Sequence, residues 1–276
     1  NLMGVVTLFA LILTVHYLTK KHVSWEVRVF LGFCLLSILS VTVLTQSRSN
    51  FVAMGVVSVI LLSRYKKVFW GFVVLFALFV LLSPMKDRFI LSEKSDIRDK
   101  GGILHRISLA YISYEIIKDY PVWGTGFGIR TFQNREAIDP YMYNRRLPEN
   151  LRMDVWVPAI NKDVEDVDVV DFLFKCPHNM FLNVGVRTGV VGLLLFLWIL
   201  FAAARMCWHT IRHGKTDALK SWGYGMAACT VMFLIKGSLD PIFTHLTEVV
   251  FFTILGMITV VWNSNSPSIS PATSPT

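Results

Sequence analysis

The sequence has few charged residues for its length. Asp, Glu, Lys and Arg make up 17% of its 276 residues, whereas an ordinary soluble domain carries roughly 25%. Hydrophobic residues reach 54% and the mean hydropathy is +0.53. A chain this poor in charge and this rich in hydrocarbon is typical of a protein whose bulk is solvated by lipid.

Cysteine is also scarce. Cys34, Cys207 and Cys229 fall within apolar runs or at their ends, and only Cys176 lies in a polar region, so neither a disulfide framework nor a zinc spacing exists. A cleavable signal peptide is not recognisable, because residues 2–18 have no basic leader and are followed by two lysines rather than by a small-residue cleavage site.

Long apolar runs dominate the rest of the chain. They are shorter in several cases than the roughly 20 residues of a spanning helix, so flanking Ser, Thr, Gly and aromatic residues must complete the spans. A soluble bundle is the alternative, but soluble helices have polar outer faces and these runs are apolar all round. We predict an all-α, polytopic membrane helical bundle of about seven spans with a large periplasmic loop domain that contains amphipathic helices. The runs are residues 2–18, 29–44, 51–62, 68–82, 190–204, 222–235 and 249–262.

The net charge of +8 suggests nucleic acid, but its distribution argues for a membrane. Residues 84–177 hold 14 of the 27 Lys and Arg residues and 15 of the 19 Asp and Glu residues, so the remainder has 13 basic and only four acidic residues. Most of this excess lies in three short connections between runs, which the positive-inside rule places in the cytoplasm. These basic residues are Lys20, Lys21, Arg28, Arg64, Lys66, Lys67, Arg205, Arg212, Lys215 and Lys220.

Alternation of the spans then places the long polar block and the turns at residues 46–50 and 236–245 on the outer face. The predicted domains are spans 1–4 in residues 1–83, a periplasmic loop domain in 84–178, spans 5–7 in 179–262 and a disordered cytoplasmic tail in 263–276. This topology puts the first residue outside, and that residue is Asn rather than Met. We therefore expect the sequence to be a fragment preceded by further helices.

Within the polar block, residues 103–120 are the best candidate for a helix. Ile107, Ala110, Tyr111, Tyr114 and Ile117 recur at helical spacing, so we expect this apolar face to lie on the membrane or to pack on the bundle. Arg106, near the start of this helix, would be held close to the outer surface.

A glycine-rich segment, Gly124-Thr-Gly126-Phe-Gly, follows this helix. No strand precedes it and no helix with a ribose-binding acid follows it, so a dinucleotide-binding loop is a weak interpretation and a tight, backbone-exposing turn is favoured. Residues 130–175 have little periodicity, and we predict a flexible lid or a solvated loop there.

Three elements in order carry a resemblance to a known family. They are the Thr45-Gln-Ser-Arg-Ser-Asn50 turn with Arg48, the Arg106 helix running into Pro121 and the glycine turn, and His178-Asn179 followed by Thr188-Gly189 and Gly192-Leu193. Together they resemble the O-antigen ligase and polymerase superfamily of bacterial envelope enzymes, with a large outer loop between the second element and the third.

The resemblance implies a metal-independent, inverting glycosyltransferase without a cofactor in the bacterial inner membrane, with its active site facing the periplasm. Its partners would be membrane lipid, a glycan donor linked to undecaprenyl diphosphate, and an acceptor hydroxyl on lipid A-core or another glycan, with no nucleic acid. On this match Arg48, Arg106 and His178 correspond to the family's essential arginines and histidine.

The residue types suit this chemistry. Arginine stays charged and offers a bidentate fork to phosphate oxygens, while a neutral histidine accepts the proton of an attacking hydroxyl. Each also has a simpler explanation: Arg48 as a snorkelling residue, Arg106 as the partner of a loop carboxylate, and His178 as a residue at a helix N-terminus.

Four further residues are candidates for substrate binding. Gly124 and Gly126 would expose backbone N–H groups, but would equally serve a turn alone. Asn179 is an expected helix cap, and Asp240 precedes Pro241 as turn-forming Asp often does. The glycines at 185, 189 and 192 are expected to permit close helix packing rather than to bind substrate.

Other functions remain open at this point. A repeat-unit polymerase of O-antigen, capsule or exopolysaccharide and a protein O-oligosaccharyltransferase share these motifs with a ligase. A transporter of lipid-linked glycan would need charges deep within spans and broken helices in paired halves, and the runs show neither. A structural scaffold leaves the two arginines and the histidine unexplained.

Overall fold

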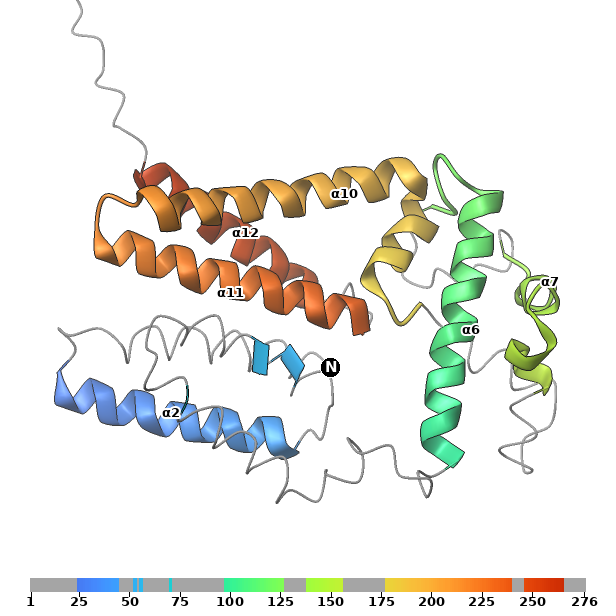
Figure 1. The fold of residues 1–276 in the computed structure, drawn as a ribbon, viewed down its shortest axis with the longest axis horizontal. Helices are drawn as coiled ribbons and strands as arrows, with labels where there is room; N and C mark the ends of the chain where they lie inside the picture. Colours follow the sequence, from blue (N-terminus) through green and yellow to red (C-terminus); the bar gives the residue numbers. More distant parts are fainter. Residues whose placement is uncertain are drawn as a thin grey trace, which may run out of the picture.

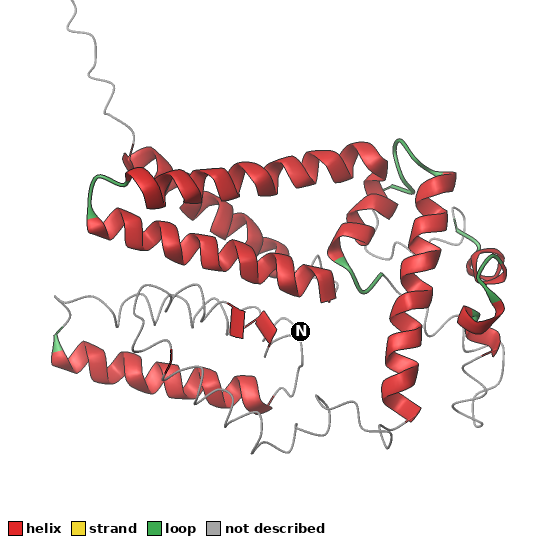
Figure 2. Cartoon of the chain, viewed as in Figure 1, coloured by secondary structure: helices red, strands yellow, loops and turns green. Residues whose placement is uncertain are grey.

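A computed structural model describes residues 24–44, 52–53, 55–56, 70, 97–126, 138–155, 177–239 and 246–265. Across these segments every regular element is a helix (Figures 1 and 2). The predicted all-α class is therefore confirmed for this part of the chain. The count of seven spans stays a prediction, because residues 2–18, almost all of 68–82 and most of 51–62 lie outside the described residues.

Three helices form a bundle in the second half of the chain. They are α10 (Met180–His213), α11 (Asp217–Leu239) and α12 (Leu246–Asn265), which run back and forth against one another (Figure 1). All three are long and apolar enough to cross a membrane. Each is longer than the apolar run that predicted it, as expected if flanking residues complete the span.

Aromatic and aliphatic side chains fill the centre of this bundle. The ring of Phe251 on α12 lies 5.9 Å from that of Phe196 on α10 and 5.0 Å from that of Phe233 on α11. Buried Leu200 and Met226 extend the same cluster. Because lipid tails are as apolar as these side chains, close van der Waals packing rather than water exclusion holds such helices together.

The outward surface of the bundle is hydrocarbon. Only 22% of the most apolar stretch of α10 is buried within the molecule. Val190, Leu194, Trp198 and Phe201 are all exposed. Water would penalise a contiguous apolar surface of this kind, whereas lipid solvates it, so the fold and the composition agree on a membrane protein.

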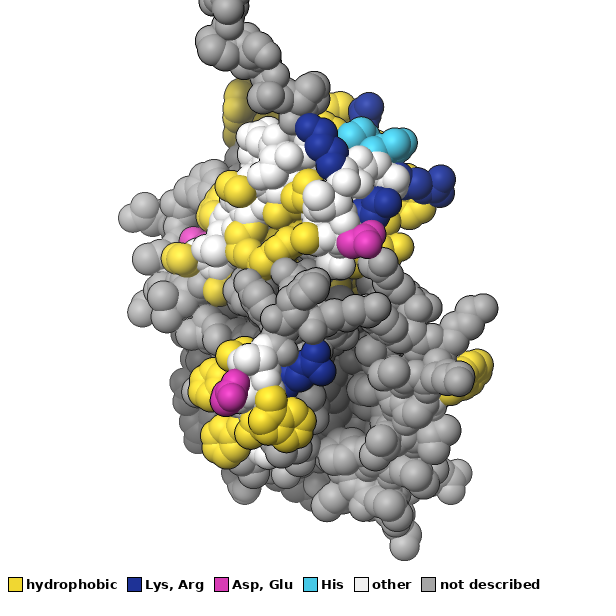
Figure 3. All heavy atoms as spheres, turned by 90° about the vertical axis from the view of Figure 1, so that its left-hand side faces the viewer, with side chains coloured by type: hydrophobic (Ala, Val, Ile, Leu, Met, Phe, Trp, Pro, Cys, Tyr) yellow, Lys and Arg dark blue, Asp and Glu magenta, His cyan; other side chains and the backbone are white. Residues whose placement is uncertain are grey.

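Helix α2 (Trp25–Leu44) occupies the second predicted run. Its first residues and the α10–α11 connection lie at the same end of the molecule (Figure 1). Seen from that end, Lys, Arg and His side chains gather on the surface (Figure 3). This gathering supports the predicted cytoplasmic position of the basic connections, which stays a prediction.

The far end of α12 differs slightly from expectation. The predicted disordered tail begins at Asn263, but the helix continues to Asn265. There the Asn265 side chain accepts a hydrogen bond of 3.0 Å from the backbone N–H of Lys215, and it is buried. This contact ties the end of α12 to the α10–α11 connection, so the tail can start only after it.

A second layer covers the opposite end of the bundle. Helix α6 (Ile97–Asp119) runs across that end and packs against the first part of α10 (Figure 1). Helix α7 (Pro140–Arg145) and the 3₁₀ helix η2 (Glu149–Leu151) pack on α6 in turn. The shared core of this layer contains Leu109, Ile112, Ile116, Ile138, Tyr143, Leu147, Met153 and Val186.

This packing corrects one expectation and bears on a second. Residues 138–155 are neither a flexible lid nor a solvated loop, because their spaced apolar side chains are buried against α6. The apolar face of α6 is expected to lie on the membrane or to pack on the bundle. Of its residues Ile117 packs on α10, whereas a different face forms the core shared with α7. Leu109, Ile112 and Ile116 are buried, whereas Ile107, Tyr111 and Tyr114 of the predicted face are exposed.

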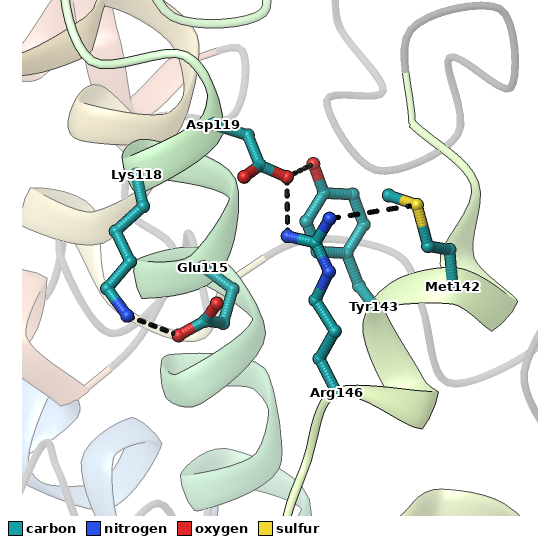
Figure 4. Close-up of polar contacts among 6 residues, drawn as sticks. All are labelled: Glu115, Lys118, Asp119, Met142, Tyr143 and Arg146. Carbon is teal, nitrogen blue, oxygen red and sulfur yellow. Dashed lines mark hydrogen bonds and ion pairs between the residues drawn. The ribbon is translucent and has the colours of Figure 1, made fainter.

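Polar contacts fasten α7 to the end of α6 (Figure 4). One Asp119 carboxylate oxygen accepts hydrogen bonds from the Tyr143 hydroxyl at 2.7 Å and from the Arg146 guanidinium at 2.6 Å. The hydrogen bond from Tyr143, reinforced by Arg146, holds the pKa of Asp119 below its usual range. The carboxylate is therefore ionised at neutral pH and keeps both partners.

Candidate functional site

The turn after α6 is joined directly to α10. Thr125 and Gly126 donate their backbone N–H groups to the carbonyl oxygens of Val186 and Arg187, at 2.8 and 3.0 Å, and Val190 donates its N–H to Pro121 at 2.7 Å. These bonds surround Gly189, whose φ of 67° interrupts the helix. A kink in a helix frees carbonyl and N–H groups, and here the turn satisfies them.

The glycines at this junction are explained by close approach. A Cβ atom on Gly124 would lie 2.4 Å from the backbone of Arg187, and one on Gly189 would lie 2.3 Å from the carbonyl oxygen of Val122. Gly126 has open space around it but a φ of 92°, which favours glycine. The predicted tight turn is confirmed, and the substrate-binding role of Gly124 and Gly126 stays a prediction.

Two of the three glycines expected to permit close helix packing, Gly185 and Gly189, have neighbouring atoms that leave no room for a side chain. A Cβ on Gly185 would lie 2.8 Å from the side chain of Ile117 on α6, so α6 approaches α10 closely there. Gly189 permits the close approach of the turn and also forms the kink.

His178 and Asn179 precede the first turn of α10. The Asn179 side-chain oxygen accepts hydrogen bonds from the N–H groups of Phe181 and Leu182, at 2.9 and 3.1 Å, so the predicted helix cap is confirmed. The amide nitrogen of the same side chain donates to the carbonyl of Ser238 on α11 at 3.1 Å. The cap thus ties the start of α10 to the end of α11, and substrate binding by Asn179 stays a prediction.

A second histidine lies against His178. The rings of His178 and His105 are 5.5 Å apart between centroids and meet edge to face, at 68°. His105 belongs to α6 and immediately precedes Arg106. Successive helix residues point about 100° apart, so the exposed Arg106 side chain leaves α6 in a different direction from that of His105.

The structure therefore brings two sequence elements into one place. The start of α10, with His178 and Asn179, meets the part of α6 that carries Arg106. The glycine turn fixes the other end of the same helix pair. The remaining candidates, Arg48 and Asp240, lie outside the described residues.

Two residues of this region are not predicted by the sequence analysis. His105 is one of them, although its position next to Arg106 is a usable signal. Lys236, in the last turn of α11, is fully buried, and its neighbour Gly237 packs on Met180 at the start of α10. A lysine at the end of an apolar run normally predicts an interfacial residue, so nothing in the sequence indicates its burial.

No group of three or more His, Cys, Asp or Glu side chains within the described segments is placed to hold a metal ion. Metal independence remains a prediction. The groups that this part of the site does offer are imidazole and guanidinium, which suit proton transfer and the binding of anionic oxygens.

Comparison with known families bears on this arrangement. Residues 32–154 match the family model described as O-antigen ligase. This segment of the chain is therefore similar to an O-antigen ligase domain. A comparison with curated proteins finds no match.

The match confirms the resemblance to the ligase and polymerase superfamily. It includes α6, the glycine turn and both candidate arginines, and it ends before His178. It gives the chain a glycan-processing, glycosyltransferase-like role of the ligase or polymerase type. Together with the apolar helices, it identifies a membrane protein of this class.

Proposed function

We propose that the protein transfers a glycan from undecaprenyl diphosphate to an acceptor hydroxyl at the periplasmic face of the bacterial inner membrane. The observation that carries this proposal is the contact of His178 with α6, inside the segment that matches the O-antigen ligase family. His178, the candidate base, lies outside the matched segment. The contact brings it against α6, which carries Arg106, a candidate phosphate-binding residue.

The proposed reaction is a displacement at the anomeric carbon of the donor sugar. The acceptor oxygen forms the new glycosidic bond on the face opposite the diphosphate, and its proton passes to a ring nitrogen of His178. The bond between the anomeric carbon and the diphosphate oxygen breaks, and its electron pair leaves with undecaprenyl diphosphate. The configuration at the anomeric carbon is inverted.

Arg48 and Arg106 are assigned to the leaving group. The diphosphate gains negative charge as the bond breaks, and two guanidinium groups stabilise that charge through bidentate hydrogen bonds. The nearby N-terminus of α10 carries a partial positive charge that favours an anion as well. In this proposal these groups supply the positive charge that a divalent ion supplies in other enzymes.

Lipid A-core is the proposed acceptor, which makes the protein an O-antigen ligase. The alternative is a repeat-unit polymerase, in which a second lipid-linked glycan supplies the hydroxyl. The family match is common to both reactions, so the acceptor has to be tested directly by offering each acceptor with the same donor.

A lipid-linked glycan transporter is less well supported. Its substrate path would need ionisable residues or broken helices within the spans. In α10, α11 and α12, the buried Lys236 lies in the last helical turn and the kink at Gly189 lies before the most apolar stretch. Both features belong to the end of the bundle that carries His178.

The decisive experiment is glycan transfer by purified variants in detergent. We expect His178→Ala to abolish transfer while the protein remains folded, because removing a base subtracts about 10²–10⁴-fold in rate without removing hydrocarbon packing. Arg48→Lys and Arg106→Lys should be strongly impaired, since a point charge does not reproduce a guanidinium fork. Transfer should persist after exhaustive chelation.

Matched controls are available on the same molecule. His213→Ala changes an exposed histidine at the opposite end of the bundle, and Arg145→Lys changes an exposed arginine on α7. Both should retain full transfer. Full activity of the His178→Ala protein would show that this residue is not the base and that the proposed mechanism is wrong.

A further inference from the structure

The turn after α6 exposes an unusual amount of aromatic and apolar surface. Trp123 is 80% exposed, and Tyr120 and Val122 beside it are also exposed. Folded proteins normally bury most of a tryptophan side chain. We therefore expect these exposed side chains to contact a partner outside the described residues.

The level of this turn relative to the spans is set by hydrogen bonds. Pro121 accepts from Val190, the first residue after the kink of α10. From Val190 onward α10 presents exposed apolar residues, among them Val191 and Leu194, to its surroundings. The turn is therefore fastened to the point at which α10 enters the apolar layer.

A face of α6 continues this apolar surface. Ile107, Tyr111 and Tyr114 are exposed and lie at positions i, i+4 and i+7, which form one stripe on a helix. One turn further on, the Lys118 ammonium lies 4.6 Å from the centre of the Tyr114 ring and pairs with Glu115 at 2.8 Å.

This stripe does not belong to the packing between α6 and α7. The Lys118 side chain that ends it lies on the side of α6 away from Tyr143 and Arg146 (Figure 4). α6 itself runs across the end of the bundle (Figure 1). A helix in this position, with exposed tyrosines and a lysine on one face, has the side chains that are enriched at a membrane interface.

We infer that the 120–123 turn and the Ile107–Tyr111–Tyr114 face of α6 rest in the headgroup layer of the leaflet on the His178 side of the bundle. The occupant of this surface is the bilayer itself. Tyr and Trp rings suit that layer because they present an apolar body and a polar tip, and Lys118 can reach the lipid phosphates. The inference does not depend on the proposed reaction.

Depth-dependent quenching tests the inference in the whole protein. The four native cysteines are replaced by alanine, a single cysteine is placed at Trp123→Cys or Tyr114→Cys, and an environment-sensitive fluorophore is attached. The protein is then reconstituted into phosphatidylcholine nanodiscs. We expect nitroxide groups near the lipid headgroup to quench both labels and iodide in the buffer to quench them weakly.

Met142→Cys is the matched control. Met142 is 38% exposed, close to the exposure of Tyr111, but it lies on α7 in the layer beyond α6. Its label should be quenched by iodide and not by the lipid nitroxide. Gel filtration establishes that each labelled variant is folded before quenching is measured.

Three results would overturn the inference. Lipid quenching at position 123 no stronger than at 142, with strong iodide quenching at both, would place the turn in water. Protection of the label at 123 from both quenchers would mean that protein, either this chain or a second copy, covers the turn. Lipid quenching at 123 without lipid quenching at 114 would remove α6 from the membrane surface.

Discussion

The imidazole of His178 has a second imidazole at its edge. His105 supplies that ring from a different helix, and the two centroids are 5.5 Å apart. A proposed base needs a fixed ring orientation, because a misplacement of about 1 Å in an active site can cost about 10²-fold in rate. His105 is therefore a positioning residue in the proposed mechanism.

We predict that His105→Ala lowers the rate of glycan transfer by about 10–100-fold, since it removes the ring that packs on His178. His105→Phe keeps an aromatic ring at the same place and should recover most of the rate. The two variants should differ in kcat more than in KM for the donor. Transfer would be measured with purified protein at saturating acceptor.

Comparing the two variants distinguishes a packing role of the His105 ring from a chemical role of its nitrogen atoms. Equal losses in His105→Ala and His105→Phe would mean that a ring nitrogen of His105 takes part in the reaction itself. Unchanged transfer in both variants would mean that the contact between the rings has no role in it.

At the scale of elements, the kink in α10 is the feature that organises the outer layer. Helix α10 has 34 residues, about 51 Å if it were straight, which exceeds the roughly 30 Å of a hydrocarbon core. The kink at Gly189 divides it into a short part that packs beside α6 and a longer part that runs through the bundle (Figure 1).

Gly189→Ala should disrupt this junction. A non-glycine residue at a φ of 67° with a ψ of −168° costs about 1–3 kcal/mol, and its Cβ would also strike the carbonyl of Val122. We predict a lower apparent unfolding temperature in detergent and a loss of transfer, because the turn can no longer close on α10.

Gly256→Ala is the control for this change. Gly256 lies within α12. Apart from its chain neighbours and the backbone of its own helix, no atom lies within 4 Å of the position that a Cβ would take there. Alanine should therefore be neutral or stabilise the helix by roughly 0.5–1 kcal/mol. If Gly189→Ala unfolded at the same temperature as Gly256→Ala, the junction would not hold the two layers together.

The sequence predicts some of these elements and not others. Helical spacing finds α6, and the expected capping of α10 by Asn179 is confirmed. Apolar spacing alone does not say which face of α6 packs in the core and which face is exposed. Tyrosines and Ile107 recur at helical spacing as regularly as Leu109, Ile112 and Ile116 do, and only contact with α7 and α10 distinguishes the two faces.

At the scale of the whole molecule, orientation in the membrane is the main untested prediction. The described basic residues near the α10–α11 connection lie at one end (Figure 3). The start of α10, which His178 closely precedes, lies towards the other end (Figure 1). If the positive-inside rule holds, the first end is cytoplasmic.

Single cysteines on a cysteine-free background test this orientation. In intact spheroplasts, we predict that a membrane-impermeant thiol reagent labels Asn150→Cys in η2 and does not label Ala218→Cys in α11 until the membrane is permeabilised. Both positions are exposed. The native Cys207 cannot serve as the inner reporter, because it is buried. Labelling of Ala218→Cys alone would reverse the orientation and move the proposed site to the cytoplasm.

The membrane character of the chain and its family are predictable from sequence, because hydropathy and ordered motifs are local properties. The meeting of His178 with His105 is not, because 72 intervening residues separate them and the contact depends on how α6 crosses the bundle. The burial of Lys236 is equally hidden, since burial is decided by neighbours from other helices.

Because of the kink in α10, the donor and the enzyme of the proposed reaction can meet within the plane of the membrane. Because the helix turns aside at Gly189, its first residues stay close to the end of the bundle instead of continuing along the axis of the span (Figure 1). Removing a lipid chain from a bilayer costs about 0.8 kcal/mol for each CH₂ group. A site at this depth lets a lipid-linked donor keep its whole tail in the leaflet, so donor and enzyme meet by lateral diffusion in a plane.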